Sequence, residues 1–255
     1  MSLESLAGRA GEGPWLGEDG RWLMVSESNN RRHLIACEVF KDEFEAVSPP
    51  DLVRTYLPQG LHRTPGKMPA AIQEVVDALP ADTGLVILGY GLCSNGVVGV
   101  TARTSPILIP KVHDCIALLL GSCERYEAEV TACAGTYYIT PGWACYGTTS
   151  LSCYKNEYLP KYGEEDARYI AQELLKNYKR VAFIDHGVGN VELGRAHAAE
   201  MAEVFNLAYA EIPGSLDYLQ RLACGPWDGE DFVWVKPGDP ISPTPFMTLH
   251  SISLP

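Results

Sequence analysis

Short apolar runs alternate with amphipathic segments along most of the chain. Unbroken apolar runs such as residues 84–88 and 106–109 are typical of parallel strands that are covered on both faces. Residues 163–179 instead place their apolar side chains at helical spacing. This alternation predicts an α/β, Rossmann-like fold with a mostly parallel sheet and helices on both of its faces.

The same pattern places the individual elements. Strands are expected over residues 33–40, 84–90, 106–109, 135–139 and 180–185, and helices over residues 41–46, 65–79, 163–179, 191–206 and 216–225 and from about Cys115 onward.

Repeated strand–loop–helix units suggest two related halves, around residues 33–130 and 135–240. Residues 1–32 are rich in glycine and acidic residues and show little periodicity, so we expect an N-terminal extension there. We expect residues 33–255 to form a single α/β domain.

Composition excludes some partners. The chain has 20 Lys and Arg against 32 Asp and Glu, which gives a net charge of −12. This charge disfavours binding to nucleic acid or to an anionic membrane surface. The first residues lack the basic start and apolar stretch of a signal peptide, so a cytoplasmic location is expected. Eight cysteines in a cytoplasmic protein indicate thiols or metal ligands rather than disulfides.

Polar and sulfur-containing side chains follow several of the predicted strands. Cys37 and Asp185 stand at the ends of the apolar runs 34–36 and 181–184, and Cys93 and the segment 113–115 lie in the loops after the second and third strands. Ligands of parallel sheets bind at the carboxyl ends of the strands, so we expect these residues to meet at one edge.

A metal site is the first interpretation of this group. Cys37, Cys93, His113 and Cys115 are the thiolate and imidazole ligands that zinc prefers, and an iron–sulfur cluster is the alternative. The chain has no CxxC pair, and buried cysteines also serve as small apolar side chains, so that interpretation stays open.

A catalytic interpretation also fits Cys115. At the start of a helix, backbone amides favour an anionic thiolate, and His113 would act as its base. Asp114 would then cap the helix or assist these two residues.

Two glycine-rich loops, LGYGLCSNGVVG and DHGVGN, are candidates for ligand contacts. Gly91, Asn95 and Gly96 in the first loop, Asp185 at the second, and His62 before a helix form the predicted cofactor-binding set. Neither loop has the GxGxxG or P-loop pattern, so they also fit simple strand–helix turns.

Five stretches, GLHRTP, VILGYGLCSNGVVG, IPKVHDCIALLLGS, GTYYITPGW and FIDHGVG, resemble the domain of unknown function 1638 family over residues 33–240. The resemblance implies a setting in anaerobic, methyl-metabolising bacteria and archaea, beside corrinoid-dependent methyltransferases. Relatives match His62, Cys93, His113, Asp114 and Cys115, whereas many have Thr at the position of His186.

Two classes of function follow. The first is a metal-binding enzyme or accessory factor in corrinoid-linked methyl transfer, in which zinc would activate a thiol and the partner would be a corrinoid protein or methyltransferase. The second is a non-catalytic module that binds a small molecule or a corrinoid partner at the strand ends.

Overall fold

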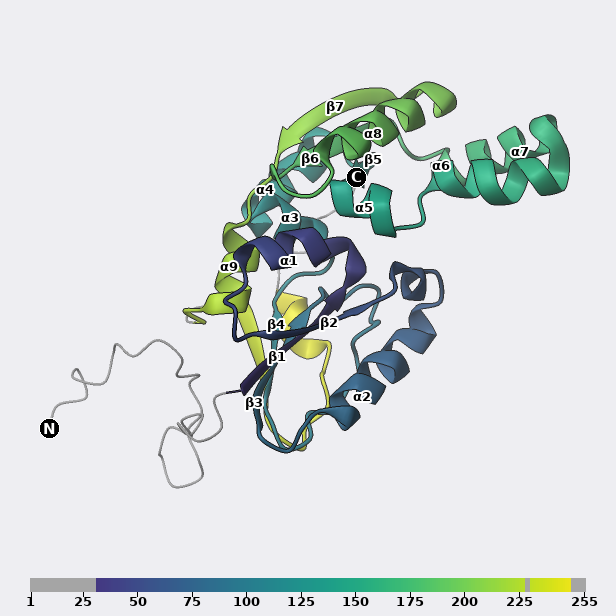
Figure 1. Cartoon of the computed structure of the whole chain (residues 1–255). Helices are drawn as coiled ribbons and strands as arrows, with labels where there is room; N and C mark the ends of the chain where they lie inside the picture. Colours follow the sequence, from purple (N-terminus) through teal and green to yellow (C-terminus); the bar gives the residue numbers. More distant parts are fainter. Residues whose placement is uncertain (1–30, 228–229, 249–255) are drawn as a thin grey trace, which may run out of the picture.

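The computed structural model describes residues 31–227 and 230–248, and it contains two sheets (Figure 1). The larger sheet has the order β2-β1-β3-β4-β8 and is parallel except for β8, which pairs antiparallel with β4. The smaller sheet, β5-β6-β7, is parallel throughout. The predicted α/β class is therefore confirmed. The strands are β1 (Arg31–Cys37), β2 (Val53–Leu57), β3 (Thr83–Gly89), β4 (Ile107–Pro110), β5 (Thr136–Ile139), β6 (Arg180–Asp185), β7 (Ala208–Pro213) and β8 (Phe232–Val235).

Helices connect the strands in both sheets. The α-helices are α1 (Lys41–Val47), α2 (Met68–Ala78), α3 (Ile116–Leu120), α4 (Cys123–Ala132), α5 (Pro141–Tyr146), α6 (Ser150–Cys153), α7 (Leu159–Leu175), α8 (Val191–Phe205) and α9 (Asp217–Cys224). Short helical turns are η3 (Glu38–Phe40), η4 (Gln59–Arg63), η5 (Pro65–Lys67), η6 (Tyr154–Tyr158) and η7 (Thr244–Thr248).

The two sheets follow the expected division of the chain into halves, with one exception. Strand β8 lies in the second half of the sequence but returns to the edge of the first sheet. Of the predicted extension, residues 1–30 lie outside the described residues, and Arg31 and Arg32 are the first residues of β1.

The central strands of the larger sheet are covered on both faces. All seven residues of β3 are buried, as are the last five of β1. Continuous burial of this kind explains their unbroken apolar sequences. The main core also includes Ala182, Ile184 and Ile212 from β6 and β7, so the two sheets share buried side chains.

The carboxyl ends of the two sheets face each other, a feature that the predicted single edge did not include. Helix α5, which follows β5, packs against η3, which follows β1. Gly142 in α5 lies directly on the Val39 carbonyl group. The loop after β6 reaches α1 and α3 through His186. Residues after the strands of both sheets therefore line one junction, visible between the lower and upper parts of Figure 1.

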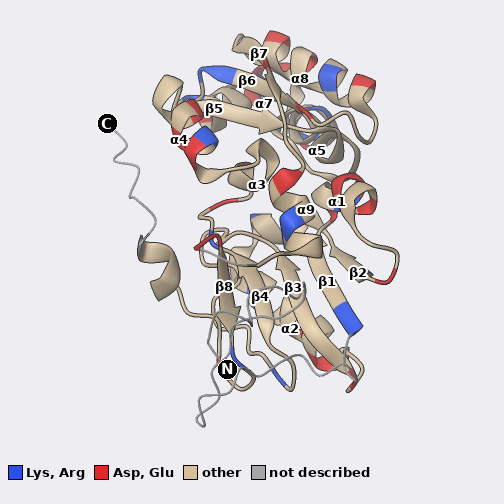
Figure 2. Ribbon diagram, turned by 90° about the vertical axis from the view of Figure 1, so that its left-hand side faces the viewer, with Lys and Arg blue, Asp and Glu red and all other residues tan. Residues whose placement is uncertain are grey.

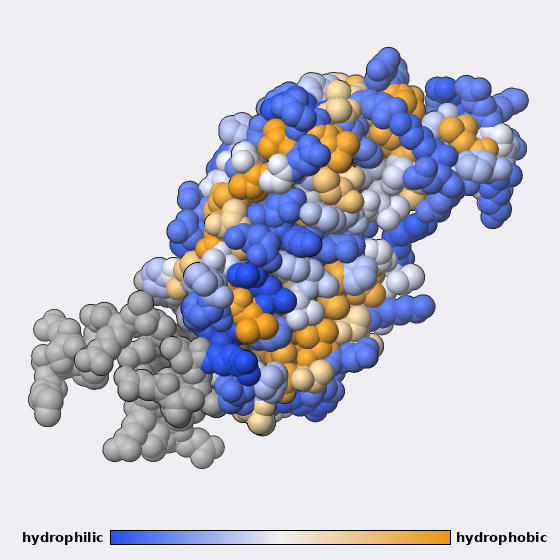
Figure 3. Space-filling model, in the orientation of Figure 1, coloured by the Kyte–Doolittle hydropathy of each residue, from blue (hydrophilic) through white to orange (hydrophobic). Residues whose placement is uncertain are grey.

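The surface is mixed in charge and hydropathy. Acidic and basic residues are interspersed on the side shown in Figure 2. In Figure 3, polar residues predominate and apolar residues lie between them in small groups. Across the described residues, no helix combines the length and the apolar character needed to span a membrane.

Candidate functional site

Two cysteines from neighbouring loops touch each other at the carboxyl end of the larger sheet. The Sγ atoms of Cys93 and Cys115 lie 3.4 Å apart, and both residues are buried. Two backbone hydrogen bonds, from Leu92 N to Val112 O and from Cys93 N to His113 O, continue the pairing of β3 and β4 beyond the strand ends. The parallel sheet itself therefore brings the two thiols together.

The loop that carries Cys93 has an uncommon backbone conformation. Cys93, Ser94 and Asn95 are consecutive non-glycine residues with φ values of 47°, 56° and 65°. Left-handed conformations cost non-glycine residues free energy, on the order of 1 kcal/mol each, and they concentrate at functional sites. Gly96 closes the turn by donating its N–H to the Cys93 carbonyl.

Tyr90 is the common neighbour of three buried thiols. Burial raises its pKa well above the usual value, and the nearby thiols of Cys37, Cys115 and Cys93 raise it further. Its hydroxyl group is buried without a hydrogen-bond partner among the described residues. Cys37 ends β1, which lies beside β3, so this third thiol comes from the adjacent strand.

His62 joins this group through Tyr90. The two rings are stacked with centroids 6.3 Å apart and planes 25° from parallel. The Nε2 atom of His62 is buried and makes no hydrogen bond within the described part of the chain. Burial lowers the pKa of His62, so its ring is neutral and its nitrogen is available as an acceptor or ligand.

Two of the buried thiols, Cys93 and Cys37, are protonated at neutral pH. The hydrogen bond with Cys115, followed by burial, raises the pKa of Cys93, and burial raises the pKa of Cys37 to about 12. Among residues 31–227 and 230–248, no group of three or more His, Cys, Asp or Glu side chains is already arranged around a metal position. The structure thus presents one close thiol pair, with further donors nearby.

The sequence pattern of the family described as "Protein of unknown function (DUF1638)" matches residues 56–223. The chain belongs to this family. No curated protein and no solved structure matches the chain. The matched range contains Cys93, Cys115, Tyr90 and His62, whereas Cys37 precedes it.

His113 and Asp114, which precede Cys115 in this DUF1638 protein, have other surroundings than the buried thiols. The His113 side chain is exposed, and only its carbonyl group contributes to the thiol pair, by accepting the Cys93 N–H. His113 is thus exposed, unlike the buried cysteines with which the sequence grouped it. Asp114 accepts hydrogen bonds from Ile116 N at 2.8 Å and from the Tyr126 hydroxyl at 2.5 Å. Its carboxylate thus binds the first turn of α3, as expected for a helix-capping residue.

The predicted cofactor-binding residues divide between two places. Gly91 packs closely on the Asp114 backbone, and Gly96 packs on the Met68 side chain. A side chain at either position would collide with these neighbours, so glycine is needed at both. The Asn95 side chain is exposed.

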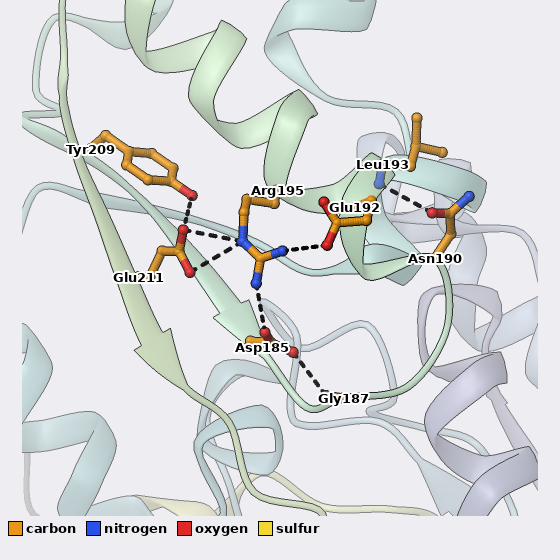
Figure 4. A network of polar contacts seen from close by, with 8 residues as sticks. All are labelled: Asp185, Gly187, Asn190, Glu192, Leu193, Arg195, Tyr209 and Glu211. Carbon is orange, nitrogen blue, oxygen red and sulfur yellow. Dashed lines mark hydrogen bonds and ion pairs between the residues drawn. The ribbon is translucent and has the colours of Figure 1, made fainter.

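Asp185 lies in the smaller sheet and has partners of its own. It accepts a hydrogen bond from Gly187 N and forms an ion pair with Arg195 (Figure 4). Arg195 also pairs with Glu192 and Glu211, which gives a polar network that fixes the loop after β6. The arrangement explains Asp185 as a structural residue of that loop.

A hollow of about 590 Å³ lies beside the segment that carries Cys115 and was not predicted from the sequence. Asp114 and Ile116, the residues on either side of Cys115, form part of its wall. Most of the other large side chains around it are aromatic, and they come from α4, β5, α5 and the end of α7. Their wide separation along the chain left no local pattern that could have revealed them.

Proposed function

We propose that this protein binds a thiophilic metal ion, with zinc as first choice and an iron–sulfur cluster as second, through Cys93 and Cys115. The observation that carries the proposal is the 3.4 Å contact between their two sulfur atoms. Cys37 is the third thiol near Tyr90, and His62 stacks on Tyr90; within the described part of the chain, His62 Nε2 and the Tyr90 hydroxyl have no hydrogen-bond partner. This donor set suits a soft metal because it consists of thiols and an imidazole rather than carboxylates.

Metal binding at these residues would be coupled to proton release. Because the pKa values of Cys37 and Cys93 are raised, each thiol must lose its proton before it can act as a ligand. A metal held by two or three thiolates keeps a position open for an exogenous ligand. When bound, such a metal would activate a thiol as a thiolate for reaction with a methyl donor.

The biological role that we propose is an enzyme or accessory factor in corrinoid-linked methyl transfer. This part of the proposal rests on the expectation that proteins of the DUF1638 family are encoded beside corrinoid-dependent methyltransferases. A non-catalytic binding module is the second candidate, and the aromatic hollow beside Cys115 favours it.

We expect anaerobically purified protein to bind one equivalent of Co²⁺ with thiolate-to-metal charge-transfer absorbance. Cys93→Ser or Cys115→Ser removes a metal ligand and should weaken Co²⁺ binding by roughly 100-fold or more. This effect is larger than that of replacing a residue that only forms a hydrogen bond with a ligand. Cys37→Ser should have a smaller effect, and binding should tighten as pH rises because protons are displaced.

The matched control is Cys224→Ser, since Cys224 is an exposed thiol outside the group. It should bind Co²⁺ like the unsubstituted protein. If the metal does not bind, and mild oxidation instead joins Cys93 to Cys115 in a disulfide, the pair is a redox dithiol and the metal proposal fails.

A further inference from the structure

The hollow beside Cys115 is lined by an aromatic group with one acidic side chain. We call it the aromatic pocket and define it by Tyr126, Tyr137, Tyr138, Trp143, Tyr178 and Asp114. Its volume of about 590 Å³ lies within the usual range of small-molecule sites, about 300–1,000 Å³. Leu174 and Tyr178, both exposed, place its mouth at the end of α7.

The charge of the pocket selects the kind of ligand. Asp114 is the one charged side chain among the described residues that line it, and no Lys, Arg or His is present there. Its two hydrogen bonds, from Ile116 N and from the Tyr126 hydroxyl, fix the orientation of the carboxylate. An anionic ligand would therefore be repelled, and a cation would be attracted.

The aromatic rings further restrict which kind of cation the pocket can bind. Tyr137 and Tyr178 pack with centroids 5.2 Å apart, and the Tyr137 hydroxyl is held by Ser150 N. The Tyr126 hydroxyl is likewise engaged, with Asp114. These rings offer apolar surfaces and aromatic π systems, and the Tyr138 hydroxyl and Trp143 Nε1 are polar groups of the wall that are buried without a hydrogen-bond partner among the described residues.

A methylated ammonium ion fits such surroundings best. It carries a positive charge and few or no N–H donors, so it loses little hydration and interacts with aromatic faces through cation–π attraction. A metal ion would need several oxygen ligands, and the pocket supplies one carboxylate.

We propose that the aromatic pocket binds a small methylated ammonium compound beside Cys115. This site goes beyond the proposed function, because ligand binding here requires no metal at Cys93 and Cys115. Asp114 and Ile116 lie in the pocket wall on either side of Cys115, so the ligand would lie beside the segment that carries this cysteine, whose own side chain is not part of the wall.

Calorimetric titration with choline tests the site, and its neutral isostere 3,3-dimethylbutan-1-ol is the matched ligand. Choline should bind saturably, and the isostere should bind roughly tenfold or more weakly because it lacks the charge. Asp114→Asn keeps the shape of the side chain and removes its charge, and Tyr178→Leu removes an exposed ring. Each should weaken choline binding by roughly threefold to tenfold.

Tyr169→Leu is the control, because Tyr169 is an exposed ring of α7 that does not line the pocket. It should leave choline affinity unchanged. Equal affinity for choline and the isostere would show an apolar hollow without cation selectivity, and absence of saturation with choline would likewise overturn the proposal. Titration of Cys93→Ser keeps the two proposals separate, since that variant should lose Co²⁺ binding and retain choline binding.

Discussion

Replacing Gly142 by alanine is expected to destabilise the protein by about 3 kcal/mol or more, at the upper end of overpacking effects. A Cβ atom at Gly142 would overlap the Val39 carbonyl oxygen and lie 2.8 Å from its carbon. These are backbone atoms, so no rotation of a side chain can relieve the contact. Helix α5 would have to move away from η3, which opens the junction between the two sheets.

Urea unfolding measures this effect, and Gly60→Ala provides the control. A Cβ atom at Gly60 has nothing within 4 Å, so its replacement should change the free energy of unfolding by no more than about 0.5 kcal/mol. Similar stabilities for the two variants would mean that α5 and η3 do not pack as described. Trp143 lies next to Gly142 and lines the aromatic pocket, so Gly142→Ala should also weaken choline binding.

The elements that the sequence predicted best are those with buried surfaces. Strands β1 and β3 are covered on both faces, and this burial requires the apolar runs that are visible in the sequence. Strand β2 was missed because it lies at the edge of its sheet and none of its residues is fully buried. Helix α4 also has no buried residue and therefore no apolar stripe. Helix α5 begins at the Pro-Gly sequence 141–142, where Pro141 occupies the first helical position.

The grouping of the cysteines could be predicted in part. Cys37, Cys93 and Cys115 lie at or after the ends of three neighbouring strands, in the order β1-β3-β4. Ligands of parallel sheets bind at the carboxyl ends of the strands, and this rule was sufficient to predict that the three cysteines lie near one another. The exposed direction of the His113 ring depends on the loop conformation, which spacing alone does not define. Tyr90 was not selected, since a tyrosine after a buried strand carries no distinctive signal.

The facing arrangement of the two sheets could not be predicted from local periodicity. It depends on contacts between residues more than a hundred positions apart, such as Glu43 with His186. Periodicity reports which face of an element is buried and gives no information on which distant element covers it.

Glu43 and His186 form a buried titratable pair at this junction. Glu43 Oε1 lies 3.5 Å from His186 Nδ1, and the two side chains are 1% and 0% exposed. His186 Nε2 donates a hydrogen bond to the Leu119 carbonyl at 2.7 Å, which leaves Nδ1 of the neutral ring facing Glu43. Burial is the main cause that raises the pKa of Glu43 to about 8, and burial also lowers the pKa of His186. Both groups are therefore neutral near pH 7.

This pair should make stability depend on pH in a defined direction. Glu43 keeps its proton in the folded protein up to about pH 8, whereas in the unfolded chain it loses the proton near its ordinary pKa of 4.5. Its contribution to stability is therefore complete below pH 4.5 and is lost as pH rises toward 8. Linkage limits this loss to about 1.4 kcal/mol per pH unit.

Glu43→Gln should remove this dependence, because the carboxamide has nearly the same shape and cannot ionise. The free energies of unfolding of both proteins are compared at pH 5.5, 6.5 and 7.5. We expect the glutamine variant to gain about 2 kcal/mol relative to the original protein over this range. His186 is present in both proteins, so its own titration largely cancels in the difference.

The control is Glu74→Gln, since Glu74 is exposed on α2 and its replacement should shift stability by the same small amount at every pH. The alternative is a pair that holds no proton, with Glu43 ionised beside a neutral His186. The folded pKa of Glu43 would then not be raised, and the glutamine variant would gain nothing between pH 5.5 and 7.5. A gain that grows with pH shows that the buried pair of Glu43 and His186 keeps one proton at the junction of the two sheets.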